Sequence, residues 1–140
     1  MAGTLLRSKV ATLPNATSWR IDSAGVWTNG GYPASGNAQM VLKKYWGLDL
    51  SAHRSQCVSR NLLDQFDLIL VMELGHKEAL RVEFPEFTNR IYLLYEMVGL
   101  NEDVWDPYGG TMADYYDTAR ELDQILTKGI ERIIRLSDTP

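Results

Sequence analysis

The 140-residue chain has one cysteine and two histidines, and these scarcities exclude several kinds of protein. Cys57 has no second cysteine with which to form an intrachain disulfide, so a disulfide-stapled secreted domain is excluded. One cysteine and two histidines make no recognisable zinc cluster, and we expect neither a metal nor another cofactor. A reducing cytoplasm is therefore the expected location.

Long apolar runs and an excess of basic residues are also missing. The longest purely apolar run, residues 68–72, is far shorter than the roughly 20 residues that a membrane span needs. Residues 1–13 lack the long apolar centre of a signal peptide. A formal net charge of -4 argues against a general binder of nucleic acid or anionic membranes. The 45% hydrophobic content and the length instead indicate one globular domain over residues 1–140.

Apolar periodicity predicts helices that alternate with short strands. Helical stripes occur over residues 1–13, 37–46, 62–66 and 76–84, and from 112 almost to the end. Strands are expected over residues 19–25, 67–72 and 91–95. Residues 67–72 are apolar throughout, as a strand buried on both faces must be. This alternation is typical of an α/β fold in which helices cover both sides of a parallel sheet, a three-layer αβα arrangement.

One loop of the predicted fold has the composition of a reactive site. Residues 105–110 place Asp106 at the head of a turn that Pro107 fixes and two glycines end, with an aromatic ring on either side. Ligands in α/β folds bind beyond the carboxyl ends of the strands. Residues 22–23, the loop after Met72 and the Asp106 loop all fall at that edge, so we expect the chemistry there.

Five segments together resemble the low-molecular-weight protein tyrosine phosphatases. They read MAGTLLR (1–7), DSAG (22–25), LDLSAHRS (48–55), DLILVM (67–72) and DPYGG (106–110), in the family's order and spacing. The resemblance implies a four-stranded parallel sheet of order 2-1-3-4 and hydrolysis of phosphotyrosine through a cysteinyl-phosphate intermediate. The related arsenate reductases share the fold, but they use additional redox cysteines that this chain lacks.

The resemblance also implies roles for five residues. Asp106 matches the general acid that protonates the leaving tyrosine oxygen and then activates water, although Asp-Pro is also a common turn sequence. Tyr108 and Trp27 would be aromatic walls beside the substrate ring, with ordinary packing as the alternative. Ser23 and His53 would hydrogen-bond the phosphate loop from behind, and the alternative for His53 is a structural histidine.

The sequence departs from the family at its first residue. In the family a first strand leads into a phosphate-binding loop, Cys-x5-Arg-Ser-Pro, and this chain begins with the residues that follow that motif. We therefore expect an N-terminally truncated domain without the first strand, the nucleophilic cysteine and the phosphate-binding arginine. Cys57 is interpreted as an ordinary free cysteine, because no glycine-rich nest or helix start precedes it. Arg54 is interpreted as solvated surface charge.

Two hypotheses of different classes remain open. In the first, the recorded start is too late and the natural protein hydrolyses phosphotyrosine or phosphoarginine on proteins, while residues 1–140 alone are inactive. In the second, the chain is a non-catalytic binding or regulatory relative. Loss of a central strand would expose its neighbours, so we expect either direct pairing of residues 19–24 with 67–72 or a swapped or strand-filled homodimer. Neither nucleic acid nor a membrane is an expected partner.

Overall fold

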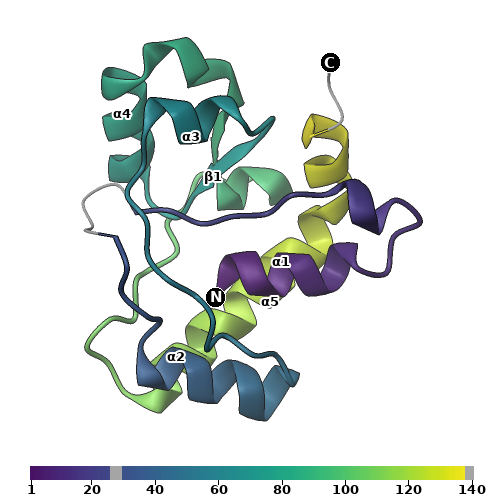
Figure 1. Cartoon of the computed structure of the whole chain (residues 1–140), viewed down its shortest axis with the longest axis vertical. Coiled ribbons are helices and arrows are strands. Elements are labelled where there is room, and N and C mark those ends of the chain that lie inside the picture. Colours follow the sequence, from purple (N-terminus) through teal and green to yellow (C-terminus); the bar gives the residue numbers. More distant parts are fainter. Residues whose placement is uncertain (26–29, 138–140) are drawn as a thin grey trace. The chain divides into compact units, whose positions relative to one another are not determined.

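The computed structural model describes residues 1–25 and 30–137 (Figure 1). The chain divides into two compact units, one built from residues 1–57 and 106–124 and the other from residue 58 to residue 105 and from residue 125 onward. The long helix α5 (Met112–Ser137) contributes its first half to the first unit and its second half to the other. Within the described ranges, no helix is long and apolar enough to cross a membrane.

The first unit is helical. Its elements are α1 (Ala2–Val10), the 3-10 turn η1 (Ala16–Ser18), α2 (Gly36–Val41), the π-helical turn η2 (Leu42–Trp46) and the first half of α5. Lys9 Nζ forms an ion pair with Asp123 Oδ1 over 2.7 Å, which ties α1 to α5. The rings of Tyr45 and Tyr116 lie 4.6 Å apart and tie η2 to the same helix. Both contacts join segments that are distant in the sequence, so α5 is the scaffold of this unit.

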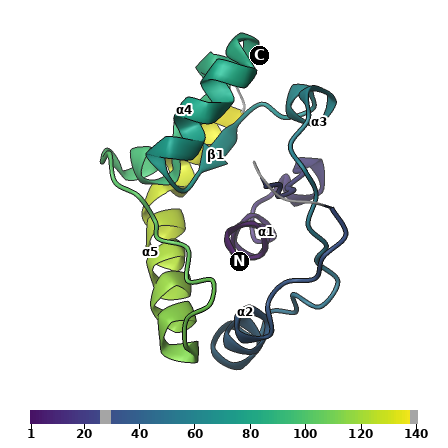
Figure 2. The same ribbon diagram turned by 90° about the vertical axis from the view of Figure 1, so that its left-hand side faces the viewer.

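The second unit contains the sheet. Its elements are α3 (Arg60–Asp64), β1 (Ile69–Val71), α4 (Leu74–Glu83), the 3-10 helices η3 (Pro85–Arg90) and η4 (Leu94–Val98), β2 (Ile91–Leu93) and the second half of α5. Strands β1 and β2 pair in parallel, with Leu70 opposite Tyr92. Helix α4 connects the two strands and packs on the sheet, and both views show it beside β1 (Figures 1 and 2). This is the crossover connection that a parallel pair requires.

The predicted helices are present, and local sequence explains their ends. Helix α2 begins at Ser35, whose side chain accepts a hydrogen bond from Ala38 N, and the following π-helical turn stops at Gly47 with φ 66°. The predicted strand at 67–72 is present as β1 but shorter, and so is the strand at 91–95, where β2 passes into η4 at Leu94. An α/β fold with a parallel sheet is confirmed, although the described part of the sheet has two strands.

The strand predicted over residues 19–25 is wrong. Among the described residues, this segment forms one isolated bridge, between Gly25 and Cys57, and no ladder. Two of its carbonyl groups accept hydrogen bonds from side chains rather than from a neighbouring strand: the Arg7 guanidinium donates to Ile21 O, and Gln56 Nε2 donates to Ser23 O. Residues 19–24 belong to no ladder in the described chain, so the direct pairing of this segment with residues 67–72 is absent.

Candidate functional site

The loop that begins at Asp106 is shaped by its own hydrogen bonds. Tyr108 N donates to Asp106 Oδ1 over 3.0 Å, and Gly110 N donates to Pro107 O over 2.8 Å. Gly109 has φ 81°, in the left-handed region where glycine is favoured. The exposed Asp106 carboxylate is thereby held by one oxygen, while Oδ2 accepts no hydrogen bond from any residue that the structure describes. An oxygen held in this way can exchange a proton with a bound molecule.

Two anchors hold the far end of this loop in the first unit. Asn37 Nδ2, from the first turn of α2, donates to Gly110 O over 3.2 Å. At the start of α5, Thr111 N donates to Asp114 Oδ2 over 2.9 Å, and Asp114 N donates to Thr111 Oγ1 over 3.2 Å. This is a reciprocal helix cap. The loop is therefore fixed by α2 and α5 and does not depend on its own turn alone.

The aromatic residues on both sides of Asp106 are uncovered. The exposed fraction is 83% for Tyr108 and 73% for Trp105. Tyr108 is thus not a packing residue of the core, which was the alternative to a role beside the substrate. Its predicted role as an aromatic wall stays a prediction. Trp27, the other predicted wall, lies outside the described residues.

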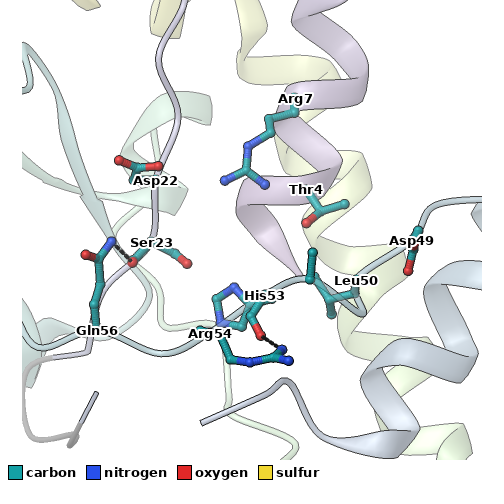
Figure 3. A pocket seen from close by; sticks show the side chains of 10 residues that line it. Thr4, Arg7, Asp22, Ser23, Asp49, Leu50, His53, Arg54 and Gln56 are labelled. Carbon is teal, nitrogen blue, oxygen red and sulfur yellow. Dashed lines mark hydrogen bonds between the residues drawn. The ribbon is translucent and has the colours of Figure 1, made fainter. Parts of the chain in front are cut away.

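A polar pocket of about 250 Å³ lies beside the first turns of α1 (Figure 3). Arg7 reaches into it from α1, Ser23 from the extended segment, and His53 and Arg54 from the loop after η2. The structure therefore places Ser23 and His53 at one pocket, and their role behind a phosphate loop stays a prediction. Asp106 and Tyr108 do not line this pocket.

Hydrogen bonds from the arginines fix the walls of the pocket. Arg7 Nη2 donates to Ile21 O over 2.7 Å and joins α1 to the segment that carries Ser23. Arg54 Nη1 donates to Ser51 O over 3.0 Å and to His53 O over 2.7 Å, which curls its guanidinium back over its own loop. Two positive side chains are thus held at one pocket in fixed orientations.

The electrostatics of the pocket disfavour a charged histidine. Partial burial lowers the pKa of His53 below its ordinary value, and the positive charges of the Met1 amino group, Arg7 and Arg54 lower it further. His53 is therefore neutral at pH 7, because the ordinary histidine pKa of about 6.5 already lies below that pH. A neutral imidazole has one donor and one acceptor nitrogen for a neighbouring loop or ligand.

Two residues of the site, Arg54 and Asn37, were not predicted from the sequence. Arg54 is exposed, as predicted, but it also lines the pocket. Its position next to His53 is the only signal that could have indicated this. Asn37 carried no signal, because a polar residue in the first turn of a helix is common.

Comparison with protein families decides what kind of protein this is. The model of the family described as low molecular weight phosphotyrosine protein phosphatase matches residues 1–136. This chain belongs to that family. The resemblance inferred from the five sequence segments is thereby confirmed.

Relatives support the same assignment. The chain is 34% identical over 134 residues to a protein-arginine-phosphatase of Geobacillus stearothermophilus, covering 95% of this chain and 86% of the relative. It is 32% identical over 133 residues to a probable low molecular weight protein-tyrosine-phosphatase of Ralstonia solanacearum, with the same coverage. A solved low molecular weight protein tyrosine phosphatase from T. tengcongensis matches with TM-score 0.88 and 39% identity, covering 94% of this chain and 88% of that one.

The family chemistry needs a thiolate, and the 140-residue sequence contains one cysteine, Cys57. Cys57 is free and exposed, and its backbone is bridged to Gly25. Family phosphate loops follow the pattern Cys-x5-Arg, whereas the sixth residue after Cys57 is Leu63. Helix α3 begins at Arg60, beyond Ser59, so Cys57 does not sit at a helix N-terminus. The described residues contain no group of three or more side chains able to hold a metal.

Proposed function

We propose that this phosphatase-family chain carries the proton donor of a phosphoprotein phosphatase, and that Asp106 is that donor. The observation that supports this is the Asp106 carboxylate, which is exposed and held at one oxygen by Tyr108 N in a loop anchored to α2 and α5. A general acid needs a fixed position and an open oxygen, and this carboxylate has both. Asp106 would protonate the leaving oxygen and then activate the water that hydrolyses the phosphoenzyme.

The substrate is a phosphorylated protein side chain, with phosphotyrosine as the first candidate. The uncovered ring of Tyr108 suits a phenyl ring beside the phosphate, and the family resemblance gives Trp27 the same role in our proposal. Phosphoarginine is the second candidate, because the relative from Geobacillus stearothermophilus is a protein-arginine-phosphatase. Ser23 and His53 would support a phosphate loop from behind, through the pocket that they share. No metal or cofactor is part of this proposal.

We also propose that residues 1–140 by themselves do not hydrolyse a phosphorylated substrate. Cys57 has neither the Cys-x5-Arg spacing nor a helix N-terminus that would stabilise a thiolate. A truncated domain whose phosphate loop is encoded upstream and a non-catalytic regulatory relative both fit this inactivity. Arsenate reduction is a weaker fit, because it needs further redox cysteines. An in-frame upstream segment that encodes a strand and Cys-x5-Arg-Ser-Pro would favour the first; an in-frame stop codon close upstream of Met1 would favour the second.

The first experiment measures hydrolysis of an aryl phosphate by the 140-residue chain. We expect no turnover above that of buffer. Clear hydrolysis that disappears in Cys57→Ser would overturn the inactivity and make Cys57 the nucleophile. Hydrolysis that survives Cys57→Ser would indicate a contaminating enzyme.

The second experiment tests Asp106 directly. The chain is extended at its N-terminus with the first strand and phosphate loop of a family member, and aryl phosphate hydrolysis is measured again. Asp106→Asn is expected to lower kcat by on the order of 10²- to 10⁴-fold. Glu102→Gln, an exposed carboxylate four residues earlier, is the matched control and should leave kcat unchanged. An Asp106→Asn variant as fast as its parent would remove Asp106 from the mechanism.

The remaining parts of the proposal concern assembly and location. The described sheet has two strands, so each of its outer edges lacks a strand partner within those residues, and a second copy could fill one by swapping or strand addition. A homodimer in light scattering at micromolar concentration would support this, and a monomer would contradict it. We further infer a single domain in a cytoplasmic protein, consistent with one unpaired cysteine.

A further inference from the structure

The side chain of Asn37 reaches from α2 to the loop that carries Asp106, and both segments belong to the first unit. Its Nδ2 atom donates a hydrogen bond to Gly110 O over 3.2 Å, across 73 positions of the chain. A carbonyl oxygen can only accept a hydrogen bond, so this contact requires the amide nitrogen of the asparagine. Among the residues that the structure describes, no other side chain from outside residues 106–114 forms a hydrogen bond with residues 106–110.

The helix that carries Asn37 is itself fixed in the first unit. Val41, one turn further along α2, is fully buried. The π-helical turn η2 continues α2, and the ring centroid of its Tyr45 lies 4.6 Å from that of Tyr116 on α5. The helix therefore contacts α5 through these rings and the Asp106 loop through Asn37.

The turn between Asp106 and Gly110 has little freedom to absorb a displacement. Gly110 N donates to Pro107 O over 2.8 Å, and a Cβ on Gly110 would lie only 2.9 Å from that oxygen. The proline ring fixes the backbone φ of Pro107, which follows Asp106 directly. The Asp106 carboxylate accepts a hydrogen bond from Tyr108 N inside the same turn. A shift of Gly110 therefore moves Asp106 or breaks the hydrogen bonds of the turn.

The cap at the start of α5 constrains only one side of Gly110. Thr111 and Asp114 exchange their hydrogen bonds within the chain that follows the loop. Glycine adopts more backbone conformations than any other residue, so such a cap leaves the direction of the Gly110 carbonyl open. The hydrogen bond from Asn37 is a second fixed point, and it comes from a separate helix.

We propose that Asn37 is a positioning residue for Asp106. By holding the Gly110 carbonyl, its amide keeps the Asp106 carboxyl group at the place from which it protonates the leaving oxygen of the substrate. The inference rests on the proposed function of Asp106. Asn37 acts through the loop and needs no contact with the substrate.

The proton of Asp106 has its largest effect when the leaving group is a strong base. As the P–O bond of the substrate breaks, the phosphoryl group passes to the thiolate of the phosphate loop, the leaving oxygen keeps the bonding electrons, and Asp106 transfers its proton to that oxygen. A nitrophenolate is stable enough to leave without this proton, whereas an unsubstituted phenolate is a stronger base. Misplacement of a catalytic group by about 1 Å costs on the order of 10²-fold in rate. Loss of Asn37 should therefore slow cleavage of a phenyl ester more than that of a nitrophenyl ester.

The first test uses the 140-residue chain and NMR of its backbone amides. In Asn37→Ala, we expect the amide resonances of Tyr108 and Gly110 to shift and their exchange with solvent to become faster by on the order of tenfold, the usual effect of one hydrogen bond. Gln39→Ala is the matched control. Gln39 lies on the same helix and donates its side-chain amide to Ala34 O over 2.9 Å, away from the loop, so the same two amides should be unchanged.

The second test measures kcat/KM in the chain extended with the first strand and phosphate loop of a family member. Asn37→Ala should lower kcat/KM for phenyl phosphate by on the order of 10- to 10²-fold. The same variant should lower kcat/KM for 4-nitrophenyl phosphate by less than about twofold, since that leaving group needs no proton. Gln39→Ala should leave both values unchanged. A purely structural role of Asn37 would lower both values equally.

Two kinetic outcomes would overturn the inference alone: equal losses toward the two substrates, or an Asn37→Ala variant as active as its parent while Asp106→Asn is impaired. Unchanged amide signals of Tyr108 and Gly110 in Asn37→Ala would overturn it in the 140-residue chain. An unimpaired Asp106→Asn variant would instead overturn the proposed function and, with it, the role of Asn37.

Discussion

Thr111 and Asp114 cap the start of α5 reciprocally, with Thr111 N donating to Asp114 Oδ2 over 2.9 Å and Asp114 N donating to Thr111 Oγ1 over 3.2 Å. Gly110 precedes this cap, and its carbonyl accepts the hydrogen bond from Asn37 Nδ2. The Asp106 loop thus leads directly into the first turn of α5 and shares its cap. A change at Gly110 should therefore act on both the loop and the cap.

Gly110→Ala should destabilise the protein and displace the loop. An added Cβ would lie 2.6 Å from Asp114 Oδ2 and 2.9 Å from Pro107 O, so the cap or the turn must open. We expect a loss of roughly 1–3 kcal/mol in the free energy of unfolding, measured by urea denaturation. Gly36→Ala is the control, because nothing lies within 4 Å of its Cβ position. Equal denaturation midpoints for Gly110→Ala and the parent chain would contradict the role of this cap.

Gly129→Ala should destabilise the second unit, although alanine is the better helix former. The new Cβ on α5 would lie 2.8 Å from Met97 Cβ and 3.1 Å from Met97 O, in η4. Overpacking of this kind typically destabilises by about 1–3 kcal/mol, more than the helix propensity gained. Gly75→Ala on α4 meets nothing within 4 Å and should be neutral or slightly stabilising. The melting temperatures of both variants and of the parent chain are measured by calorimetry. A Tm for Gly129→Ala above that of the parent chain would disprove the close packing.

The ion pair between Lys77 and Glu96 should make stability depend on pH in the acid range. Lys77 is 7% exposed, and its Nζ lies 2.8 Å from Glu96 Oε2, which also accepts a hydrogen bond from Leu93 N. Burial opposes the charged form of Glu96, but these bonds and the charges of Lys77 and Arg81 outweigh it, so the pKa of Glu96 is lowered.

A lowered folded-state pKa means that this stabilisation is complete above the unfolded value of about 4.3 and is lost as pH falls through the folded value. Glu96→Gln should cost on the order of 3 kcal/mol at pH 7, because it leaves Lys77 buried without its counter-charge. The difference in the free energy of unfolding between the parent chain and Glu96→Gln, measured by urea denaturation, should become smaller below about pH 4.3. A gap that stays constant down to pH 3 would show that the pair does not titrate with folding.

The pKa of His53 should lie below that of a histidine in an unstructured chain. Partial burial lowers its pKa first, and the charges of the Met1 amino group, Arg7 and Arg54 add to that effect. As pH falls, His53 binds a proton in the unfolded chain at a higher pH than in the folded chain. The free energy of unfolding should therefore fall as pH drops below about 6.5. Arg54→Gln should raise the pKa of His53, as followed by NMR of the imidazole protons. Arg20→Gln, whose partner is Asp22, is the control; an equal shift in both variants would remove Arg54 as a cause.

Local patterns in the sequence were sufficient for the helices and for the two strands that pair. Their signals are short-range: the Ser35 cap and the Gly47 stop bound the helix at 36–46, and the apolar run around Ile69 indicates a buried strand. Residues 19–25 have the same β-prone composition, yet they form no ladder. Arg7 and Gln56, which are distant in sequence, donate hydrogen bonds to carbonyl groups of this segment that would otherwise accept from a neighbouring strand. Composition cannot indicate such competition, because it depends on which side chains the fold brings near.

The sequence by itself determined the family, through five short segments whose order and spacing survive without any knowledge of contacts. It also determined the Asp106 turn, since proline and glycine restrict the backbone locally wherever they occur. Only the tertiary structure decided what holds that turn and what surrounds it. Asn37 is far from Gly110 along the chain, and Leu74 is far from Asp103, so the hydrogen bonds that join them arise from packing. Exposure of Trp105 and the joint pocket of Ser23 and His53 are likewise properties of the folded chain, because burial is set by neighbours that residue types do not specify.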